Sequence, residues 1–321
     1  MKVRLLFAAA FACLVTASVQ GQTFPNKPVK IIMPFPTGVG PDTVMRLVGE
    51  RLARIWGQQV IVDNRPGGNG FVAIEAARRA APDGYTFFLA DAPLITVTPH
   101  LFKKLPVDPR DFEPVASLYR TYYYVTVAAD SKWKNVGDLI SAAKASPGKL
   151  SYGSSGVGGN IHLGGAMMEK AAGIKMTHVP YKETPQIYAD ISKGEINWAV
   201  GTASTTQPML EMHRVKYLAI TAPKRSALFP DVPTVAESQG PANFELQTWV
   251  SLFAPRGTPP AIVSKVNADI ARVLQDPEIR QRLATFGFEP LIQSPEELKK
   301  MAIADEAKLS ALVKELNISL D

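Results

Sequence analysis

The sequence predicts an α/β protein built as two lobes that are joined by two crossing strands, with a ligand cleft between them. Strand-like, loop-like and helix-like segments alternate up to residue 90 and again between residues 150 and 221. Such alternation is typical of α/β folds with a largely parallel sheet. Strand-like segments near 122–127 and 246–253 separate the two sets and supply the crossings. Loops at the carboxyl ends of the strands are then expected to meet in the cleft.

The first set of elements begins with a short apolar strand and a loop rich in proline and glycine. Apolar residues recur at helical spacing after this loop, starting at Val44, and Asp42 precedes them as a candidate N-cap. In order, we expect a strand at 29–33, a loop at 34–41, a helix at 43–56, a strand at 59–63, a loop at 64–70, a helix at 71–81 and a strand at 85–90.

The rest of the chain holds the second set of elements and a largely helical end. Pro147 and Gly148 stop the first helix of this part. In order, we expect strands at 112–118 and 122–128, a helix at 135–145, a strand at 150–153, a helix at 161–172, a strand at 175–179, a helix at 185–193, strands at 198–200 and 215–221, a connector at 222–240, a strand at 249–253, and helices at 259–275, 277–285 and 295–316.

The first residues have the pattern of an export signal. Lys2 and Arg4 form a short basic segment, and the apolar run at 5–16 is too short to span a bilayer. Small residues follow, which predicts cleavage after Gly21 and a periplasmic mature protein. A membrane anchor, or a lipoprotein formed at Cys13, is the alternative. The expected division is a signal peptide at 1–21, lobe 1 at 22–124 and 247–321, and lobe 2 at 125–246.

Composition argues against several classes of function. Cys13 is the one cysteine and lies in the signal segment, so the mature chain has neither a disulfide framework nor a thiolate zinc site. The four histidines do not have the spacing of metal ligands. The formal net charge of +6 comes from dispersed basic residues, which suits the attraction of acidic solutes better than nucleic-acid binding. We expect no metal, no cofactor and no nucleic-acid partner.

The most informative stretch is a loop rich in glycine and hydroxyl groups at 154–160, between a strand and a helix. Its small residues let a ligand approach the backbone, and the helix start offers unpaired N–H groups and a partial positive charge. Ser154 and Ser155 add hydroxyl donors, and the combination predicts an anion site. The loops at 35–42 and 64–70 hold equivalent places before helices, so we expect all three loops to face the cleft.

Two residues beside these loops, and one aromatic cluster, each allow two interpretations. Asp42 either caps a helix, which is favoured, or partners a ligand ammonium or hydroxyl. His162 either packs and hydrogen-bonds to the loop, which is favoured, or contacts the ligand. Tyrosines 119, 122, 123 and 124 cluster at the first crossing, where packing is the default and ring stacking on an aromatic ligand is the alternative.

The familiar catalytic patterns are missing from the sequence. The run at 153–157 lacks the final glycine of a G-x-S-x-G nucleophile elbow. The run at 38–43 lacks the last glycine of the dinucleotide fingerprint, and no G-x-x-x-x-G-K-[ST] loop occurs. We therefore expect a protein that is not an enzyme. The alternative is an exported serine hydrolase that uses Ser154 or Ser155, for which His162 is the one candidate base.

Several short motifs occur in a fixed order along nearly the whole mature chain. They are the proline- and glycine-rich loop at 34–42 and the runs at 62–70, 82–85, 105–112, 154–156, 162–163, 178–181, 230–237 and 254–259. Together they resemble the substrate-binding proteins of tripartite tricarboxylate transporters, the Bug-type family. A collinear series of this kind is far more specific than any one glycine-rich loop.

The resemblance implies a two-lobe periplasmic-binding-protein fold of the type II-like, twice-crossed kind. It also implies a monomeric receptor that delivers an organic carboxylate to membrane permease subunits. In the family, loops of the first lobe grip one ligand carboxylate through backbone N–H groups and hydroxyls, and loops of the second lobe select the rest. With the residues argued above, the expected ligand-binding set is Phe35, Pro36, Thr37, Gly38, Asp42, Ala92, Ser154, Ser155, Gly158, Gly159, Asn160, His162, Thr184, Gly201, Thr202 and Ser204.

Three places depart from the family pattern. Glu183 stands where glycine is usual, and the segment 90–95 differs from the usual small and polar one. The segment 201–206 lacks the usual acidic residue, which argues against an amino-acid ligand, and its hydroxyls suit a second carboxylate. We expect a dicarboxylate, and with the tyrosine cluster an aromatic one such as terephthalate is a specific hypothesis. An aliphatic di- or tricarboxylate is the alternative. A ligand-binding accessory of a sensor kinase is the alternative to a transport receptor.

Overall fold

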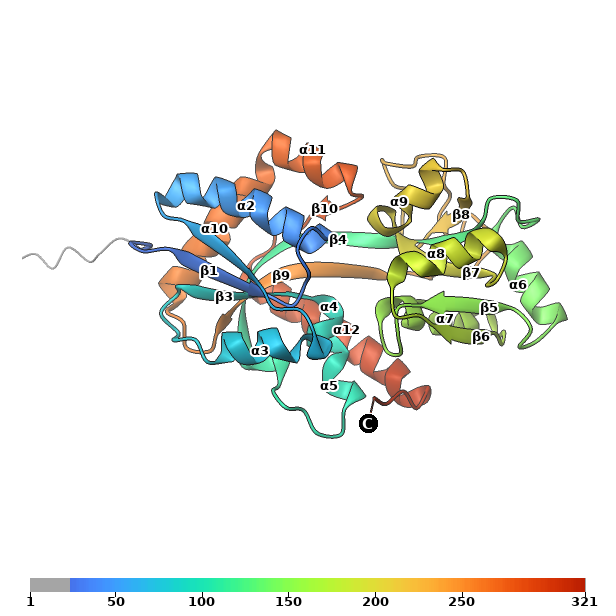
Figure 1. Ribbon diagram of the computed structural model, residues 1–321, viewed down its shortest axis with the longest axis horizontal. Coiled ribbons are helices and arrows are strands. Elements are labelled where there is room, and N and C mark those ends of the chain that lie inside the picture. The colour runs from blue at the N-terminus through green and yellow to red at the C-terminus, as the bar shows by residue number, and fades with distance from the viewer. Residues whose placement is uncertain (1–23, 321) are drawn as a thin grey trace, which may run out of the picture.

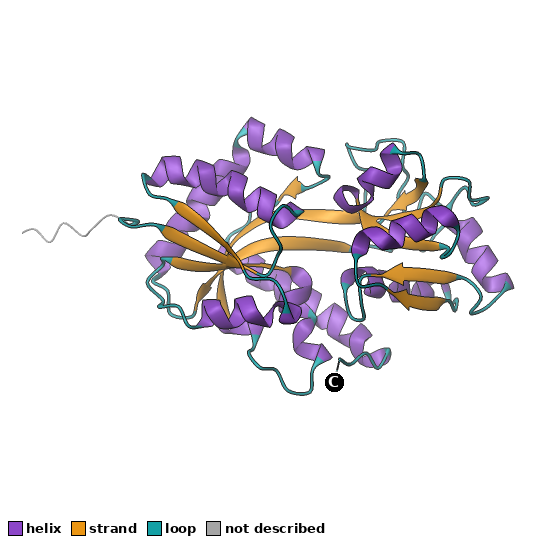
Figure 2. Ribbon diagram, in the orientation of Figure 1, coloured by secondary structure: helices purple, strands orange, loops and turns teal. Residues whose placement is uncertain are grey.

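The structure, a computed structural model, describes residues 24–320. The expected signal peptide, its cleavage site at Gly21 and Cys13 lie outside the described residues. Figure 1 shows two bodies side by side, joined by two long strands, with the C-terminal helix running past the junction. Helices pack around strands in both bodies (Figure 2), which confirms the two-lobe α/β fold.

Three parallel strands start the sheet of the first lobe. β1 (Val29–Met33) lies between β2 (Val60–Asn64) and β3 (Thr86–Asp91). Helices α2 (Gly40–Trp56) and α3 (Phe71–Arg78) connect these strands. The β-strands and helices here follow the expected order, because each apolar run is bounded by a turn rich in glycine or proline.

Helix α2 begins before the position that the sequence indicated. Its N-cap is Val39, and Pro41 lies in the first turn, where proline is well tolerated. Asp42 is therefore inside the helix, so the predicted cap at this residue is wrong. A carboxylate in the first turn still stabilises the helix, because it faces the positive end of the helix dipole.

Two long strands pass through both lobes. β4 (Phe112–Ala128) and β9 (Gln247–Pro255) pair antiparallel with each other, and β9 also pairs antiparallel with β3. The predicted break in β4 between 118 and 122 is absent, because Tyr119 and Thr121 pair with Val250 and Thr248 of β9. The sheet is thus mixed rather than largely parallel.

The second lobe adds its own parallel strands to β4. Its strands are β5 (Ser151–Ser154), β6 (Thr177–Pro180), β7 (Trp198–Thr202) and β8 (Val215–Ile220). Its helices are α6 (Val136–Ala145), α7 (Asn160–Ala172), α8 (Thr184–Lys193) and α9 (Ala203–Glu211). β5 pairs parallel with β6 and β7, and β4 pairs antiparallel with β7 and β8.

The C-terminal part of the chain returns to the first lobe. It forms α10 (Pro260–Gln275), α11 (Pro277–Thr285), the short strand β10 (Glu289–Pro290) and α12 (Pro295–Glu315). The far end of α12 also touches the second lobe, where Leu312 shares a buried apolar cluster with Leu163 of α7. This helix is a third link between the lobes, in addition to the two strands.

Several short elements were not expected from the sequence. They are α4 (Ala92–Thr96), α5 (Thr98–Leu101), α9, β10 and the 3-10 turns at Gly68–Gly70 and Pro109–Asp111. Helices α4 and α5 each have a proline in the first turn and are too short to show a helical period. Helix α9 contains Pro208 and a run of threonines, which are weak helix formers.

Each lobe has its own apolar core. Trp249 of β9 and Trp198 of β7 are fully buried, and Trp249 donates its indole N–H to Asp305 of α12 at 2.8 Å. Among residues 24–320, no helix is long and apolar enough to cross a membrane. Within the same residues, no group of three or more acidic, histidine or cysteine side chains could hold a metal ion.

Candidate ligand-binding cleft

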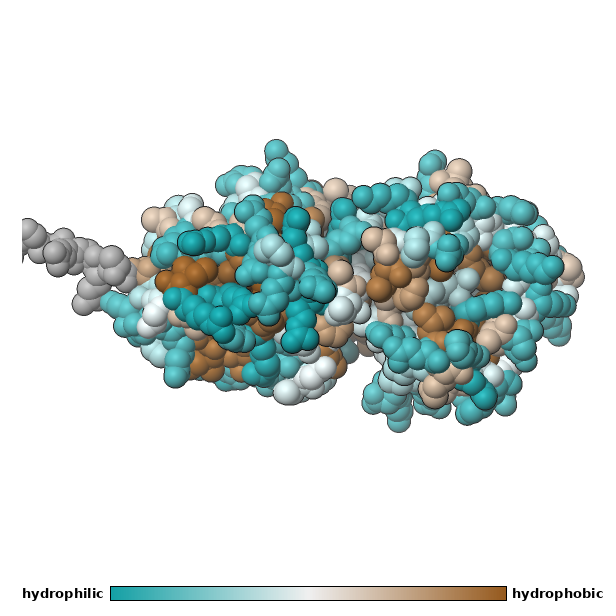
Figure 3. Space-filling view, turned by 90° about the horizontal axis from the view of Figure 1, so that it is seen from above, coloured by the Kyte–Doolittle hydropathy of each residue, from teal (hydrophilic) through white to brown (hydrophobic). Residues whose placement is uncertain are grey.

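A cavity of 280 Å³ lies between the two lobes, close to the lower end of the range for small-ligand sites. Residues from all three loops that the sequence analysis placed at the cleft contribute to its walls. The lining residues of the first lobe include Phe35, Asn69, Asp91 and Thr98. Those of the second lobe are Ser155, Val157, Gly158 and Gly159. Figure 3, seen from above, shows the surface narrowing between the lobes.

Asp42 links the first two loops from beneath. Its Oδ2 accepts from the N–H of Gly38 at 2.8 Å and from Nε of Arg46 at 3.0 Å. Its Oδ1 accepts from Nδ2 of Asn64 at 2.8 Å, and that Nδ2 also donates to the carbonyl of Phe35 at 3.0 Å. Burial alone would raise the pKa of Asp42, but hydrogen bonds from Arg46, Gly38 and Asn64 outweigh it and hold the pKa below its usual value. Protein groups thus occupy both carboxylate oxygens of this residue.

The glycine loop of the second lobe reaches the cavity at the start of α7. Gly158 has a φ of +82°, and a Cβ on it would come within 2.7 Å of Leu101 in α5, so only glycine fits this contact between the lobes. The N–H of Gly158 donates to Nδ1 of His162 at 3.0 Å, and Nδ2 of Asn160 donates to the hydroxyl of Tyr123 at 3.0 Å. His162 and Asn160 therefore hold the loop in shape, and neither lines the cavity.

Ser154 lies below this loop rather than on its surface. The residue is fully buried, and its Oγ contacts Nε2 of His178 at 2.6 Å. The same Oγ donates to the carbonyl of Gly156 and accepts from the N–H of Gly156. Ser155 is exposed and lines the cavity. The two serines thus have different tasks: one shapes the loop, and the other faces the cleft.

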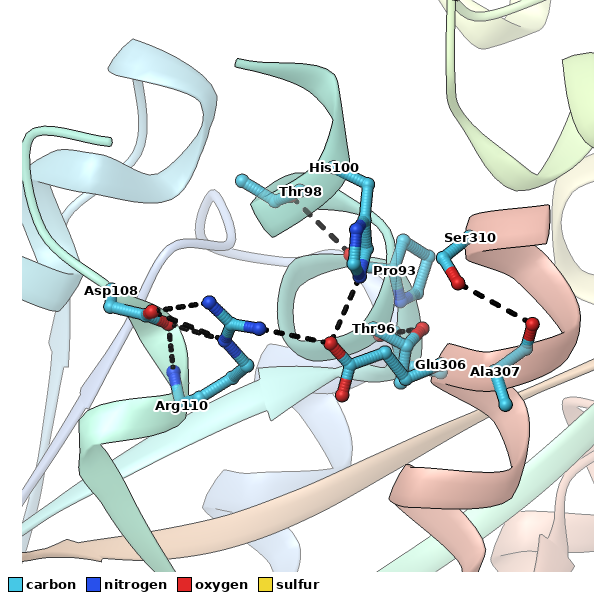
Figure 4. Close-up of polar contacts among 10 residues, drawn as sticks. Pro93, Thr96, Thr98, His100, Asp108, Arg110, Glu306, Ala307 and Ser310 are labelled. Atoms are coloured by element: carbon cyan, nitrogen blue, oxygen red, sulfur yellow. Dashed lines mark hydrogen bonds and ion pairs between the residues drawn. The ribbon is translucent and has the colours of Figure 1, made fainter. Parts of the chain in front are cut away.

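Helices α4 and α5 form the wall of the cavity beside α12. Figure 4 shows how this wall is fixed: Oε1 of Glu306 in α12 lies 2.9 Å from Nε2 of His100 and accepts from Arg110 at 3.1 Å. Thr98, which lines the cavity, has its hydroxyl 3.3 Å from the carbonyl of Pro93. The wall is therefore held by polar contacts to α12 and is preformed.

Asp91 is the one charged residue that lines the cavity in the described part of the chain. It ends β3 and caps α4, where its Oδ1 accepts from the N–H of Leu94 at 3.3 Å. Burial raises the pKa of Asp91 to about 6, and backbone hydrogen bonds offset this rise only in part. Asp91 lies in the segment 90–95, which departs from the family pattern, but it is not in the expected ligand-binding set. Its position at the carboxyl end of a strand, where ligands of α/β proteins usually bind, was the sequence feature that could have identified Asp91 as a site residue.

The predicted ligand-binding residues fall into two groups. Those that line the cavity are Phe35, Ser155, Gly158 and Gly159. The others lie outside its walls: Pro36, Thr37, Gly38, Asp42, Ala92, Ser154, Asn160, His162, Thr184, Gly201, Thr202 and Ser204. Of the first-lobe residues in the second group, Pro36, Thr37 and Gly38 are exposed, whereas Asp42 and Ala92 are buried.

The hydroxyl-rich segment that follows β7 forms a cluster of its own. Oγ1 of Thr202 lies 3.1 Å from the hydroxyls of both Ser204 and Thr205, and Thr206 donates to the carbonyl of Thr202 at 2.9 Å. Much of the hydrogen-bonding capacity of these side chains is thus used locally, at the start of α9.

The tyrosines at the first crossing are packing residues in this structure. Tyr119, Tyr122, Tyr123 and Tyr124 are all buried. Tyr119 stacks on Phe288 with ring centroids 4.2 Å apart, and Tyr124 stacks on Tyr217 at 4.3 Å. None of the four lines the interlobe cavity, so the rings are not placed to frame an aromatic ligand there.

A larger hollow of 560 Å³ lies elsewhere, between α7, residues 241–244 and α12. Its walls are mainly apolar, with Met167, Phe244 and Leu312, and two lysines stand at its edge. Unlike the smaller cavity, it is not lined by the glycine-rich loops that end strands. We therefore place the candidate site in the interlobe cavity.

Comparisons with known proteins agree on one family. Residues 44–318 match the model described as the tripartite tricarboxylate transporter family receptor. BugT of Bordetella pertussis is 30% identical over 295 residues, which cover 91% of this chain and 90% of BugT. A solved R. palustris protein with adipate is 30% identical, has a TM-score of 0.82 and covers 92% of this chain and 99% of its own. MatC from Rhodopseudomonas palustris with bound malate is 28% identical, has a TM-score of 0.76 and covers 90% and 100%.

Proposed function

The chain belongs to the family of tripartite tricarboxylate transporter receptors, and we propose that it is a periplasmic receptor that captures an organic dicarboxylate and delivers it to a membrane permease. The family is one of solute-binding receptors and not of enzymes. The proposed route is capture in the interlobe cavity, closure of the lobes, and presentation of the closed complex to the permease. The N-terminal segment is proposed to be cleaved near Gly21 during export.

The observation that carries the proposal is the shared lining of the cavity. Phe35 and Asn69 approach it from the first lobe, and Ser155 and Gly159 approach it from the second. A ligand held between them would contact both lobes at once, so its binding energy would favour the closed form. The first turn of α7 supplies N–H groups that a carboxylate can accept without a positively charged side chain.

The size and walls of the cavity favour a small aliphatic dicarboxylate over an aromatic one. Two related proteins were solved with adipate and with malate, which are both aliphatic dicarboxylates. Stacking by the tyrosine cluster was the argument for terephthalate, and those rings are buried away from the cavity. Terephthalate belongs in the test as the aromatic member of the panel.

The test is a thermal-shift panel on the mature protein, followed by calorimetry of every acid that shifts the melting temperature. The panel contains succinate, malate, adipate, citrate, glutamate, benzoate and terephthalate. We expect a rise in melting temperature with at least one aliphatic dicarboxylate, because a ligand that binds only the folded state stabilises it. A shift with terephthalate alone would overturn the aliphatic assignment, and no shift with any acid would overturn the receptor itself.

A further inference from the structure

The cavity between the lobes has an unusual charge pattern for an anion site. No lysine, arginine or histidine among residues 24–320 is in its lining, while the carboxylate of Asp91 is. The only donors recorded to this carboxylate within residues 24–320 are backbone N–H groups, those of Leu94 and of Asp91 itself. A ligand with only negative charges would therefore meet a like charge in the wall.

Because the carboxyl group of Asp91 is buried, a positively charged hydrogen-bond donor would stabilise its ionised form strongly. Burial raises the pKa of Asp91 to about 6, which still leaves the group mostly ionised at pH 7. Its charge raises the pKa of Tyr119 and Tyr123, which are both buried phenols and carry no positive charge. An ionised carboxylate without a positively charged neighbour is stabilised most by a ligand that brings a cationic hydrogen-bond donor.

We propose that Asp91 selects a ligand that carries a protonated amine in addition to its carboxylate. This inference rests on the proposed receptor function and names the class of acid that the same site takes. The ligand carboxylate lies towards the glycine loop of the second lobe, and the ammonium lies against Asp91 at the end of β3. The acidic counter-charge that the segment 201–206 lacks is thus supplied from the other lobe.

The test compares acids that differ only by an amine. Calorimetry at pH 7.5 measures the affinity of the mature protein for succinate and L-aspartate, and for butyrate and 4-aminobutyrate. We expect the amine to tighten binding on the order of tenfold or more in at least one pair, the typical size of a charge-assisted hydrogen bond. Asp91→Asn should abolish that preference, and since asparagine is an equally good N-cap, α4 should persist. Asp83→Asn, an exposed carboxylate far from the cavity, is the matched control and should keep the preference.

The outcomes separate this inference from the receptor function. If succinate binds at least as well as L-aspartate, butyrate binds at least as well as 4-aminobutyrate, and Asp91→Asn changes neither ratio, the inference is wrong while the receptor stands. If no acid of either kind binds to the wild-type protein, the receptor function fails first. Circular dichroism and melting temperature of both variants establish that the comparison is made between folded proteins.

Discussion

Oγ of Ser154 and Nε2 of His178 lie 2.6 Å apart beneath the glycine loop of the second lobe. The same Oγ also contacts the carbonyl and the N–H of Gly156, so the hydroxyl group is held inside the loop. Ser154 is fully buried and is not among the lining residues of the interlobe cavity, so this pair is set apart from the candidate site. A nucleophilic hydroxyl must reach its substrate, so the burial of Ser154 argues against a catalytic role for the pair.

The first prediction follows from this pair. A serine-directed phosphonate should not label the protein, because Ser154 is fully buried and its hydroxyl bonds within the loop. Ser154→Ala should lower the free energy of unfolding by about 1–3 kcal/mol, because the N–H of Gly156 loses its acceptor and Nε2 of His178 loses its hydrogen-bond partner. It should also weaken ligand binding through the loop. Mass spectrometry after labelling and urea unfolding measure the two effects.

The matched control for this variant is Ser155→Ala. Its hydroxyl is exposed in the same loop, so the change in unfolding free energy should stay within about 0.5 kcal/mol. Stoichiometric labelling of Ser154 would revive the hydrolase hypothesis.

The second prediction concerns the stacked histidines under the same loop. The rings of His162 and His178 have centroids 4.0 Å apart, and burial first, with the charge of His178 second, lowers the pKa of His162 to about 4. The unfolded chain binds a proton on this ring near pH 6.5, whereas the folded chain does not until about pH 4. The stability from the neutral ring is complete above pH 6.5 and is lost as the pH falls towards 4.

Urea unfolding at pH 7.5 and pH 5 measures this loss. His162→Asn keeps an acceptor for the N–H of Gly158 but does not titrate, so its stability should fall less between the two values. An equal fall in both proteins would mean that other groups carry the pH dependence. Because burial also lowers the pKa of His178, His178→Asn should reduce the fall in the same direction.

The third prediction tests the link between the two loops of the first lobe. Asp42→Ala removes the shared acceptor of Gly38, Arg46 and Asn64, so the loops should separate at the edge of the cavity. We expect a loss of roughly 1–3 kcal/mol in the free energy of unfolding and at least tenfold weaker ligand binding. Asp63→Ala, which removes a surface ion pair on the neighbouring strand, should change neither by much. Unchanged affinity in Asp42→Ala would show that the loops hold their places without it.

Sequence patterns predicted most of the fold, because each lobe repeats strongly apolar strands and amphipathic helices between glycine-rich turns. These patterns failed where an element is too short to show a period, or where pairing with a distant strand determines the structure. The sequence predicted a break between two strands at Tyr119 and Thr121, yet pairing with β9 keeps both residues in one extended strand. Helix α4 is too short to show a period, and it is capped by Asp91, whose role depends on what β3 brings next to it.

The candidate site shows the same limit. The sequence indicated the three loops, because glycine-rich runs that precede helices can be recognised from the sequence alone. It could not separate a loop residue that faces the cavity from one that supports the loop from behind. Ser155 and Ser154 are adjacent and chemically identical, and only the direction of the strand end decides that one is exposed and the other fully buried. A side chain from a different element, such as His178, then determines what the buried one does.

The last prediction concerns Gly165, in the middle of α7. Alanine usually stabilises a helix by about 1 kcal/mol relative to glycine. Here a Cβ would run into the ring of Tyr152, which is buried. That ring stacks on His178, with centroids 5.1 Å apart, and lies at a tilt to Trp198, with centroids 5.8 Å apart. Because this ring is buried and packed against two other rings, the cost of overpacking should exceed the gain in helix propensity, and Gly165→Ala should cost about 1–3 kcal/mol in urea unfolding. In a Tyr152→Ala background the same substitution should become stabilising, because the space is then open. A cost that persists in that background would place the strain in the backbone of α7 rather than against the ring.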